Sequence, residues 1–504
     1  MVTALVVTAV IYLCILVTIG LVAYKSTKKT PQDFFVANRS LGPIILLFTT
    51  FATGMSAFTM IGVPESGYSD GLGQFLGIGF GDAFMAALVF FIGFRLWKAS
   101  KEFGFVTPSE FLNHRFDSKG GVGVVYWITA IVFTVPYIGI QTIGGAVALQ
   151  VASGGKIPYF EAAIITIAIV VFYTLIGGLR AVAWTDTIQG VIMLVSVIVL
   201  FVLTATHVGS FGDVTNRLID SNLGSLFYLP GPRGLWKWQF IISFALLGTI
   251  SLPMTPQVFT RFYMGKDVKA MQGMMVYWPI MCLILFFPMV LIGAWGHEIL
   301  PNLANPDEIL PLMVSQLFHP YIAAFVIIGI FCALMSTASA QFLVISSIVT
   351  RDIYVNYLNK NASGRQQVLV GRIVILAVAI ISTILAINPP SVVIAIGAWS
   401  FQGFTVMFPV VVAGLYWKKA TKAGALWSGI VSAVLLVGYL TGVVPNSLTF
   451  GFMPFIPTLV VASIVLVVVS KYTAPLDEKL VDSYFQKVWM PKKKLAIGES
   501  VTEQ

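Results

Sequence analysis

The residues of this chain that are best suited to handle an ion lie in one apolar, membrane-length stretch between Ile327 and Tyr354. Its polar side chains stand where a lipid-facing helix would carry Leu or Val: Ser336, Thr337, Ser339, Gln341, Ser346, Ser347 and Thr350. On a helix, Ser336 and Thr337 share a face with Ala333, so another backbone can approach two hydroxyl groups. Hydroxyl and carbonyl oxygens bind hard cations such as Na+ because their dipoles replace the hydration shell. The alternative is that these hydroxyls bond to their own helix carbonyls or join neighbouring helices.

The composition of the chain indicates that this stretch lies in a membrane. Of the 504 residues, 58% are hydrophobic and only 10% are charged, and the mean hydropathy is +0.91. These values indicate an all-α polytopic membrane protein, in which about 20 apolar residues cross the bilayer each time. Thirteen spans are predicted, which places the termini on opposite sides: residues 3–24, 42–63, 74–97, 122–150, 160–178, 182–205, 236–258, 272–297, 318–347, 370–387, 391–416, 423–443 and 453–470.

The Lys and Arg residues predict the orientation, since short cytoplasmic loops keep the positive charges. With the N-terminus outside and the C-terminus inside, the outer side keeps only Lys156, Arg217, Arg233 and Lys237 of the 30 Lys and Arg residues. The net charge of +9 then follows from topology, and no nucleic-acid partner is expected. The first span reads as a retained helix and not as a signal peptide. We therefore expect a multi-pass protein of the cell membrane, with a single transmembrane domain over 1–470 and a basic cytoplasmic tail over 471–504.

Two spans carry helix-breaking residues at corresponding places. The second has Gly54 among weak helix formers, and the seventh has Pro253 and Pro256, each of which removes an internal hydrogen bond. Unwound backbone at membrane depth is tolerated only where it is buried in protein or lines a wet cavity, and paired breaks are typical of secondary transporters. No nucleophile elbow, phosphate-binding glycine loop or metal-binding motif occurs, which argues against an enzyme.

Several motifs resemble those of the sodium:solute symporter family. They are Ala333-Leu-Met-Ser336-Thr337-Ala-Ser339-Ala-Gln341, Arg39-Ser40-Leu41-Gly42, Ile176-Gly177-Gly178-Leu179-Arg180 with Trp184-Thr185-Asp186, and Arg261-Phe262 after the seventh span. The resemblance implies a LeuT-type core of two inverted repeats of five spans, over 42–205 and 236–416. An extra helix, 3–24, would precede this core, and extra helices over 423–470 would follow it.

The resemblance also implies a site for a coupling Na+ between the first and eighth core helices. Its ligands would be the main-chain carbonyls of Ala52, Met55 and Ala333 and the hydroxyls of Ser336 and Thr337.

Some relatives bind a second Na+ with an acidic residue that corresponds to Asp186 and with hydroxyls that include Ser339. Ala340 stands where those members carry another hydroxyl, which leaves a second Na+ in doubt. The alternative role of Asp186 is to cap the start of its helix.

The solute is expected to bind beside the ion, among polar but mostly neutral side chains. The candidates are Thr53, Ser56, Asp82, Tyr137, Gln141, Ser251, Thr255, Ser400 and Gln402. No Lys or Arg is predicted deep in these spans, so a carboxylate on the solute would rely on helix N-termini and backbone amides. Asp82 is the ionisable exception, with either a contact to the solute or coupling ion or a structural hydrogen bond as its role. Proline transporters of the family carry Asp where this chain has Gly54, which makes proline a less suitable solute.

Together, these residues predict a Na+-coupled secondary active symporter that imports a small organic solute by alternating access. The solute would be a carboxylate such as pantothenate or a monocarboxylate, or an amino acid. Na+, the solute and the lipid bilayer are the expected partners, without an organic cofactor, and the protein is expected to work as a monomer. The alternatives are a symporter driven by H+ through Asp82 or Asp186, and a facilitative channel.

Overall fold

The computed structural model describes residues 2–25, 36–118 and 121–489, and their regular structure is helical. Within these ranges, ten helical segments are long and apolar enough to cross a membrane, and two bent helix pairs raise the number to twelve. The long spans include α1 (Val2–Lys25), α8 (Gly121–Ala152), α9 (Tyr159–Val208), α13 (Val268–Trp295), α15 (Pro320–Ile348), α16 (Gly364–Ile387), α19 (Lys422–Leu440) and α20 (Phe455–Tyr472). Two further spans are composite: η3 (Phe75–Gly79), α5 (Phe80–Leu88), η4 (Val89–Gly93) and α6 (Phe94–Phe103) form one, and α17 (Val393–Thr405) and α18 (Phe408–Tyr416) form the other.

Short helices connect or extend these spans. They are η1 (Ala37–Arg39), α7 (Pro108–Arg115), α10 (Phe211–Leu218), η5 (Ile219–Leu223), η6 (Gly224–Leu226), η7 (Gly296–Glu298), η8 (Pro306–Glu308), α14 (Ile309–Leu317), η9 (Val349–Leu358), η10 (Asn446–Thr449) and α21 (Glu478–Trp489). In the ninth predicted span, 318–347, the helix continues beyond the predicted end, because η9 extends α15 to Leu358.

Helix α9 holds two apolar segments, Tyr159–Leu175 and Ala181–Val208. The hydroxyls of Tyr173 and Thr185 contact each other although they lie 12 residues apart. Twelve residues of a straight α-helix span about 18 Å, which is too far for this contact. The chain therefore reverses direction between these two residues, as expected for two successive spans.

Two spans are bent at the places where the sequence carries its helix breakers. The second span consists of α3 (Pro43–Gly54), η2 (Phe58–Gly62) and α4 (Val63–Asp70), with a bend of 61° after Gly54. The seventh consists of α11 (Trp238–Met254) and α12 (Pro256–Met264), with a bend of 55° at Thr255. Pro253 lies in the last turn of α11, where it cannot donate to the carbonyl four residues earlier, and Pro256 begins α12, a position that suits a proline because the amide there has no helical acceptor.

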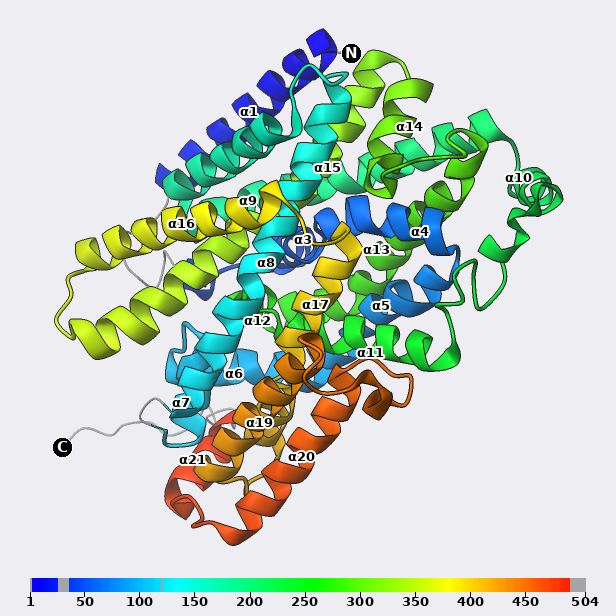
Figure 1. The fold of residues 1–504 in the computed structure, drawn as a ribbon. Coiled ribbons are helices and arrows are strands. Elements are labelled where there is room, and N and C mark those ends of the chain that lie inside the picture. Colours follow the sequence, from blue (N-terminus) through cyan, green and yellow to red (C-terminus); the bar gives the residue numbers. More distant parts are fainter. Residues whose placement is uncertain (1, 26–35, 119–120, 490–504) are drawn as a thin grey trace, which may run out of the picture.

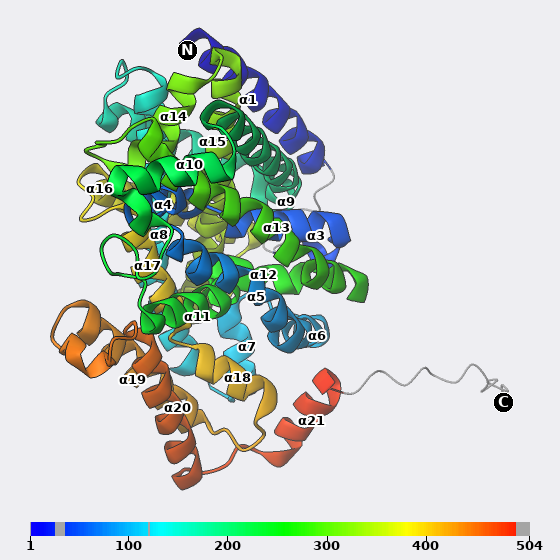
Figure 2. The ribbon, with the colours of Figure 1, turned by 90° about the vertical axis from the view of Figure 1, so that its right-hand side faces the viewer.

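Helix α15 lies at the centre of the molecule, where it packs against α9, α8, α1, α16 and α3 (Figure 1). Its residues from Val326 to Ile348 are all buried. In both ribbon views α19 and α20 lie together at the end of the molecule away from α1, next to α21 (Figures 1 and 2). The segment that carries Ser336, Thr337 and Ser339 is thus enclosed by protein.

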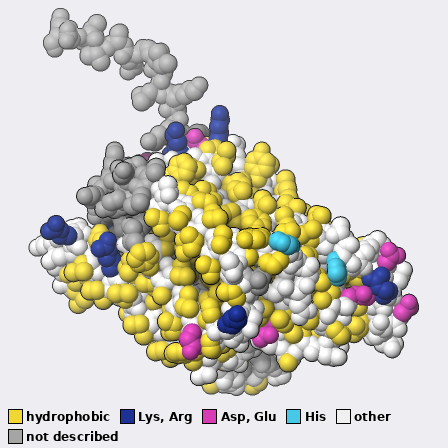
Figure 3. All heavy atoms as spheres, turned by 90° about the horizontal axis from the view of Figure 1, so that it is seen from above, with side chains coloured by type: hydrophobic (Ala, Val, Ile, Leu, Met, Phe, Trp, Pro, Cys, Tyr) yellow, Lys and Arg dark blue, Asp and Glu magenta, His cyan; other side chains and the backbone are white. Residues whose placement is uncertain are grey.

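The outer surface of the bundle is largely hydrophobic. Figure 3 shows hydrophobic side chains over most of the visible face and only isolated charged ones. Large exposed side chains include Ile380 and Ile384 of α16 and Val434 of α19. Such a surface suits contact with lipid chains.

The predicted basic tail, 471–504, begins with an amphipathic helix. Helix α21 buries Val481, Tyr484, Phe485 and Val488 and packs against α6. Residues 490–504 of this tail lie outside the described part of the chain.

Candidate functional site

A cluster of five oxygen atoms lies where α15 passes the break between α3 and η2. The Ser336 hydroxyl is 2.7 Å from the Ala52 carbonyl oxygen and 3.0 Å from that of Ala333. The Thr337 hydroxyl is 2.9 Å from the Met55 carbonyl oxygen and 3.4 Å from that of Ala52. All five residues are buried. The structure therefore brings together every atom of the predicted Na+ ligand set.

The break in the second span makes these carbonyls available. Helix α3 ends at Gly54, and the next helical residues begin only after Ser56, so the carbonyls of the last turn have no helical donor of their own. In the structure, the two hydroxyls of α15 donate to them. Small residues on α15 permit this close approach, since Ala333 lies one turn before Ser336 and Thr337.

The chemistry of the cluster suits a hard monovalent cation. Its oxygens come from carbonyls and hydroxyls, and none carries a formal charge. No group of three or more His, Cys, Asp or Glu side chains that could hold a metal ion occurs in the described part of the chain. Uncharged oxygen donors fit Na+ better than a transition metal, which prefers imidazole or thiolate ligands.

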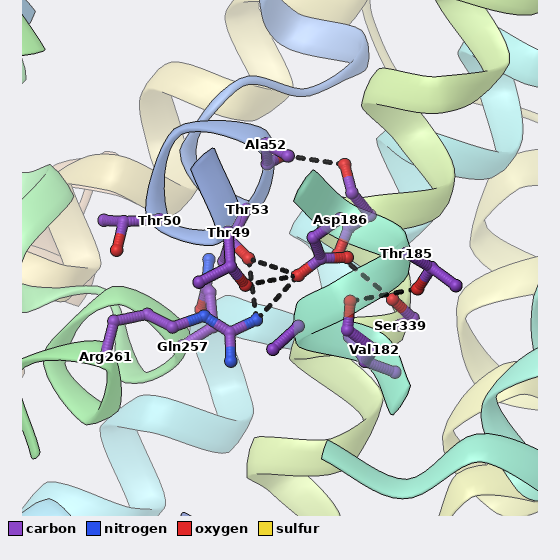
Figure 4. A network of polar contacts seen from close by, with 12 residues as sticks. Thr49, Thr50, Ala52, Thr53, Val182, Thr185, Asp186, Gln257, Arg261 and Ser339 are labelled. Atoms are coloured by element: carbon purple, nitrogen blue, oxygen red, sulfur yellow. Dashed lines mark hydrogen bonds and ion pairs between the residues drawn. The ribbon is translucent and has the colours of Figure 1, made fainter. Parts of the chain in front are cut away.

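A second buried network lies one turn away and is charged (Figure 4). Oδ2 of Asp186 accepts hydrogen bonds from the hydroxyls of Thr49 and Thr53 at 2.8 and 3.3 Å, and from Nη2 of Arg261 at 3.0 Å. The same Nη2 is 2.8 Å from the Thr53 hydroxyl. The side chains of Arg261 and Asp186 are 1% and 0% exposed. This network joins α3, α9 and α12 through a buried ion pair.

Two sequence-based expectations about this region are wrong. An arginine does lie deep beside the predicted cavity, because Arg261 belongs to α12, the second half of a broken span, and not to a loop. Asp186 does not cap a helix, since its carboxylate bonds to side chains of α3 and α12. One sequence signal could have located Arg261, namely its position only five residues after Pro256, too close for a helix of normal length to have ended.

The structure shows no hydrogen bond between Asp186 and Ser339, the two residues suggested for a second Na+. The Ser339 hydroxyl donates to the Ser336 carbonyl of its own helix at 3.1 Å. Oδ1 of Asp186 has no hydrogen-bond partner among the described residues, while Oδ2 has three donors. A second Na+ at Asp186 and Ser339 stays a prediction.

Three of the predicted solute-binding residues meet at the break of the second span. The Ser56 and Tyr137 hydroxyls are 3.0 Å apart. Oε1 of Gln141 accepts from the Ala57 amide at 2.9 Å, and its Nε2 donates to the Tyr137 carbonyl at 3.0 Å. Helix α8 therefore supplies polar side chains to the unwound backbone, directly beside the five-oxygen cluster.

Other predicted solute-binding residues are engaged elsewhere. Thr53 belongs to the charged network, and the Thr255 hydroxyl donates to Leu252 of its own helix. Ser400 likewise bonds within α17, and Oε1 of Gln402 accepts from the amide of Phe455 at the start of α20. Gln402 thus contributes to packing between helices.

The remaining two candidates, Ser251 and Asp82, are buried without a partner for their polar side-chain atoms in the described structure. The Ser251 hydroxyl has no hydrogen bond. Trp278 donates to the main-chain carbonyl of Asp82 at 2.7 Å, but the carboxylate accepts no bond from the described residues.

Comparisons with known proteins give consistent results. A family model described as "Sodium:solute symporter family" matches residues 34–432. The sodium/pantothenate symporter of Haemophilus influenzae is 30% identical over 473 residues, which cover 92% of this chain and 95% of the relative. The high-affinity proline transporter PutP of Bacillus subtilis is 31% identical over 432 residues, covering 83% and 88%.

Solved structures share the fold. A substrate-bound, outward-open Na+-coupled sialic acid symporter matches with a TM-score of 0.78 at 19% identity, covering 94% of this chain and 99% of that one. Mhp1, a nucleobase-cation-symport-1 family transporter, matches in a closed conformation with a TM-score of 0.58 at 16% identity, covering 90% and 99%. The architecture is therefore that of LeuT-like Na+ symporters.

Proposed function

The chain belongs to the sodium:solute symporter family, and on that premise we propose that it imports a small organic solute together with Na+ by alternating access. Members of this family are multi-pass transporters of the cell membrane, not enzymes, and use Na+ as the coupling ion. We also propose which residues bind the ion, where the solute binds and how the chain crosses the membrane.

The five-oxygen cluster is the proposed Na+ site. The carbonyl oxygens of Ala52, Met55 and Ala333 each lie within hydrogen-bond distance of the Ser336 or the Thr337 hydroxyl. Each hydroxyl now donates its proton to a carbonyl, and rotation of that proton would turn the hydroxyl lone pairs toward the ion and leave the carbonyl oxygen free to bind it. This convergence of uncharged oxygens on a broken helix is the observation that carries the proposal.

Alternating access follows from which elements hold the cluster. The carbonyl of Ala52 belongs to the last turn of α3 and that of Met55 to the residue directly after it, while both hydroxyls belong to α15. A movement of α3 away from α15 would therefore open the ion site and release Na+. Since the ion contacts both helices only while they are close, Na+ stabilises the closed arrangement through differential affinity.

The proposed topology has thirteen helices with the N-terminus outside. The reversal between Tyr173 and Thr185 supports counting α9 as two spans. We further propose that 42–205 and 236–416 are the inverted repeats of the core, since the two bent helix pairs begin them. The protein would act as a monomer, with its hydrophobic outer surface in contact with lipid.

The proposed solute site adjoins the ion site, at Ser56, Tyr137 and Gln141. A carboxylate on the solute could accept hydrogen bonds from backbone amides at the two helix breaks, which are the amino ends of half-helices. Pantothenate, a monocarboxylate and an amino acid all carry such a group.

Replacing both hydroxyls tests the ion site. In proteoliposomes, Ser336→Ala with Thr337→Ala should abolish Na+-stimulated uptake without reducing expression, because two of five ligands are lost. Ser463→Ala is the matched control, since that exposed hydroxyl bonds only to Leu459 of its own helix. Undiminished uptake by the double variant would exclude the assignment, and uptake that persists when choline replaces Na+ at fixed pH would favour H+ coupling instead.

A further inference from the structure

Among the buried carboxylates that the structure describes, that of Asp82 alone lacks a hydrogen-bonding or ionic partner. Asp82 lies on the buried face of α5 and is 7% exposed. Asp186 and Asp70 each pair with an arginine, and Asp352 accepts from a threonine hydroxyl. No described donor or basic side chain contacts the carboxylate of Asp82. An ionised carboxylate in such a place is costly unless something neutralises it.

Asp82 lies between the two interrupted spans. Helix α11 approaches it at Gly248, where an added Cβ would lie 2.6 Å from Oδ1 of Asp82. Trp278 of α13 donates to the Asp82 carbonyl, and its ring lies 3.0 Å from where a Cβ on Gly54 would be. Helix α5 packs against both α11 and α13 (Figure 1). The indole ring of Trp278 thus lies between the main-chain carbonyl of Asp82 and the break in the second span.

A second unpaired group lies on the helix that faces Asp82. Gly248 and Ser251 are three residues apart and share a face of α11. The Ser251 hydroxyl is 1% exposed and has no hydrogen-bond partner. Buried polar groups normally find partners, so an unpaired hydroxyl on α11 and an unpaired carboxylate that faces the same helix at Gly248 indicate that a ligand completes both.

We propose that Asp82 binds a protonated amino group of the transported solute, so that the solute is a small amine or amino acid. An ammonium group offers three donors and one positive charge, which matches an unpaired carboxylate beside an unpaired hydroxyl. Na+ has a separate set of ligands at Ser336 and Thr337. The glycine at position 248 lets the backbone of α11 pack directly against the carboxylate, where a larger residue would collide with it. This inference rests on the proposed symport function and narrows its substrate class.

Matched pairs of solutes test the inference on the purified full-length protein. The pairs are alanine and lactate, β-alanine and 3-hydroxypropionate, and proline and tetrahydro-2-furoate, with pantothenate as a further amine-free compound. In Na+ buffer, an amine should raise the melting temperature while its amine-free analogue does not, because binding stabilises the folded state. Asp82→Asn should weaken binding of that amine roughly 30-fold or more. Asp220→Asn, which changes an exposed aspartate, should bind it normally.

Three results would overturn the inference. A rise in melting temperature with an amine-free compound, if it is also seen in Asp82→Asn, would show that the carboxylate does not select the solute. If no amine raised the melting temperature, the proposed binding of an amino group by Asp82 would likewise be excluded. Na+-free uptake that is driven by a pH gradient and lost in Asp82→Asn would assign the carboxylate to proton coupling.

Two controls separate this inference from other failures. Solute-free Asp82→Asn should melt at the same temperature as the unchanged protein or higher, since it removes an unpaired buried charge; a lower value would reveal a structural partner and contradict the proposal. Failure of the proposed symport function would give a different result: an amine would raise the melting temperature equally with and without Na+.

Discussion

The buried ion pair between Arg261 and Asp186 should contribute to stability as a unit. Its members are 1% and 0% exposed, with 3.0 Å between Nη2 and Oδ2. Arg261→Met would leave the Asp186 carboxylate with only the hydroxyls of Thr49 and Thr53 as donors. Asp186→Asn would leave a guanidinium whose Nε already lacks a partner among the described residues. Removing one member of a buried pair typically costs about 3–5 kcal/mol, because the other charge stays buried.

The expected loss of unfolding free energy can be expressed as a change in melting temperature. An unfolding entropy of about 2.1 cal/mol/K per residue makes 1 kcal/mol equivalent to about 1 °C for a chain of 504 residues. Each single variant should therefore melt about 3–5 °C lower in detergent at fixed Na+. The double variant, Arg261→Met with Asp186→Asn, should lose less unfolding free energy than the two single variants added together. The difference should be about 2–3 kcal/mol, because the double variant leaves no buried charge without a partner.

An additive double variant would refute this account, since two groups that do not interact lose stability independently. The control is the exposed pair of Arg217 and Glu298, whose side chains are 47% and 22% exposed. Arg217→Met should change stability by only about 0–1 kcal/mol, because solvent screens such pairs.

Three further predictions concern single positions. Gly248→Ala should cost about 1–3 kcal/mol in thermal melts and impair uptake, since the new Cβ would lie 2.6 Å from Oδ1 of Asp82; normal uptake and melting would show that α11 can move aside. Burial raises the pKa of Asp307, which lies in a short helix between spans, to about 6. The folded protein then holds a proton that the unfolded chain has lost, so stability should fall as the pH rises from about 4 to 6, and Asp307→Asn should remove that slope. Arg115→Ala should lower the melting temperature by several degrees without changing Na+ affinity, because its guanidinium donates to the carbonyls of Gly414 and Trp417 at 2.8 and 2.9 Å at about 1.5–3 kcal/mol for each bond.

The positions of the spans follow from sequence because the bilayer demands long apolar segments. The predicted spans 122–150 and 423–443 correspond to Gly121–Ala152 and Lys422–Leu440. Helix ends are less predictable where a helix leaves the apolar region. Helix α15 passes into η9 and continues through polar residues to Leu358, because a polar helix can persist once it packs against its neighbours.

The convergence of Ser336 and Thr337 on the break in α3 could be anticipated from local signals, namely hydroxyls in an apolar run and a glycine among weak helix formers. The closeness of Arg261 to Pro256 could have assigned it to a helix, but its buried ion pair could not be anticipated in this way. Its partner Asp186 lies 75 residues earlier, and hydropathy assigns any arginine near the end of a span to the surface. A buried ion pair between distant segments depends on the tertiary arrangement of α9 and α12, which no local pattern records.

The uncharged nature of the five-oxygen cluster has an electrical consequence. Since no carboxylate contributes to it, a Na+ ion held by Ser336, Thr337 and the three carbonyls keeps its whole positive charge. Each transport cycle would then move that charge through the membrane field when the solute itself is zwitterionic. A membrane potential contributes about 2.3 kcal/mol per charge for every 100 mV. The protein should therefore generate a measurable inward current, and its solute gradient should depend on voltage as well as on Na+ concentration.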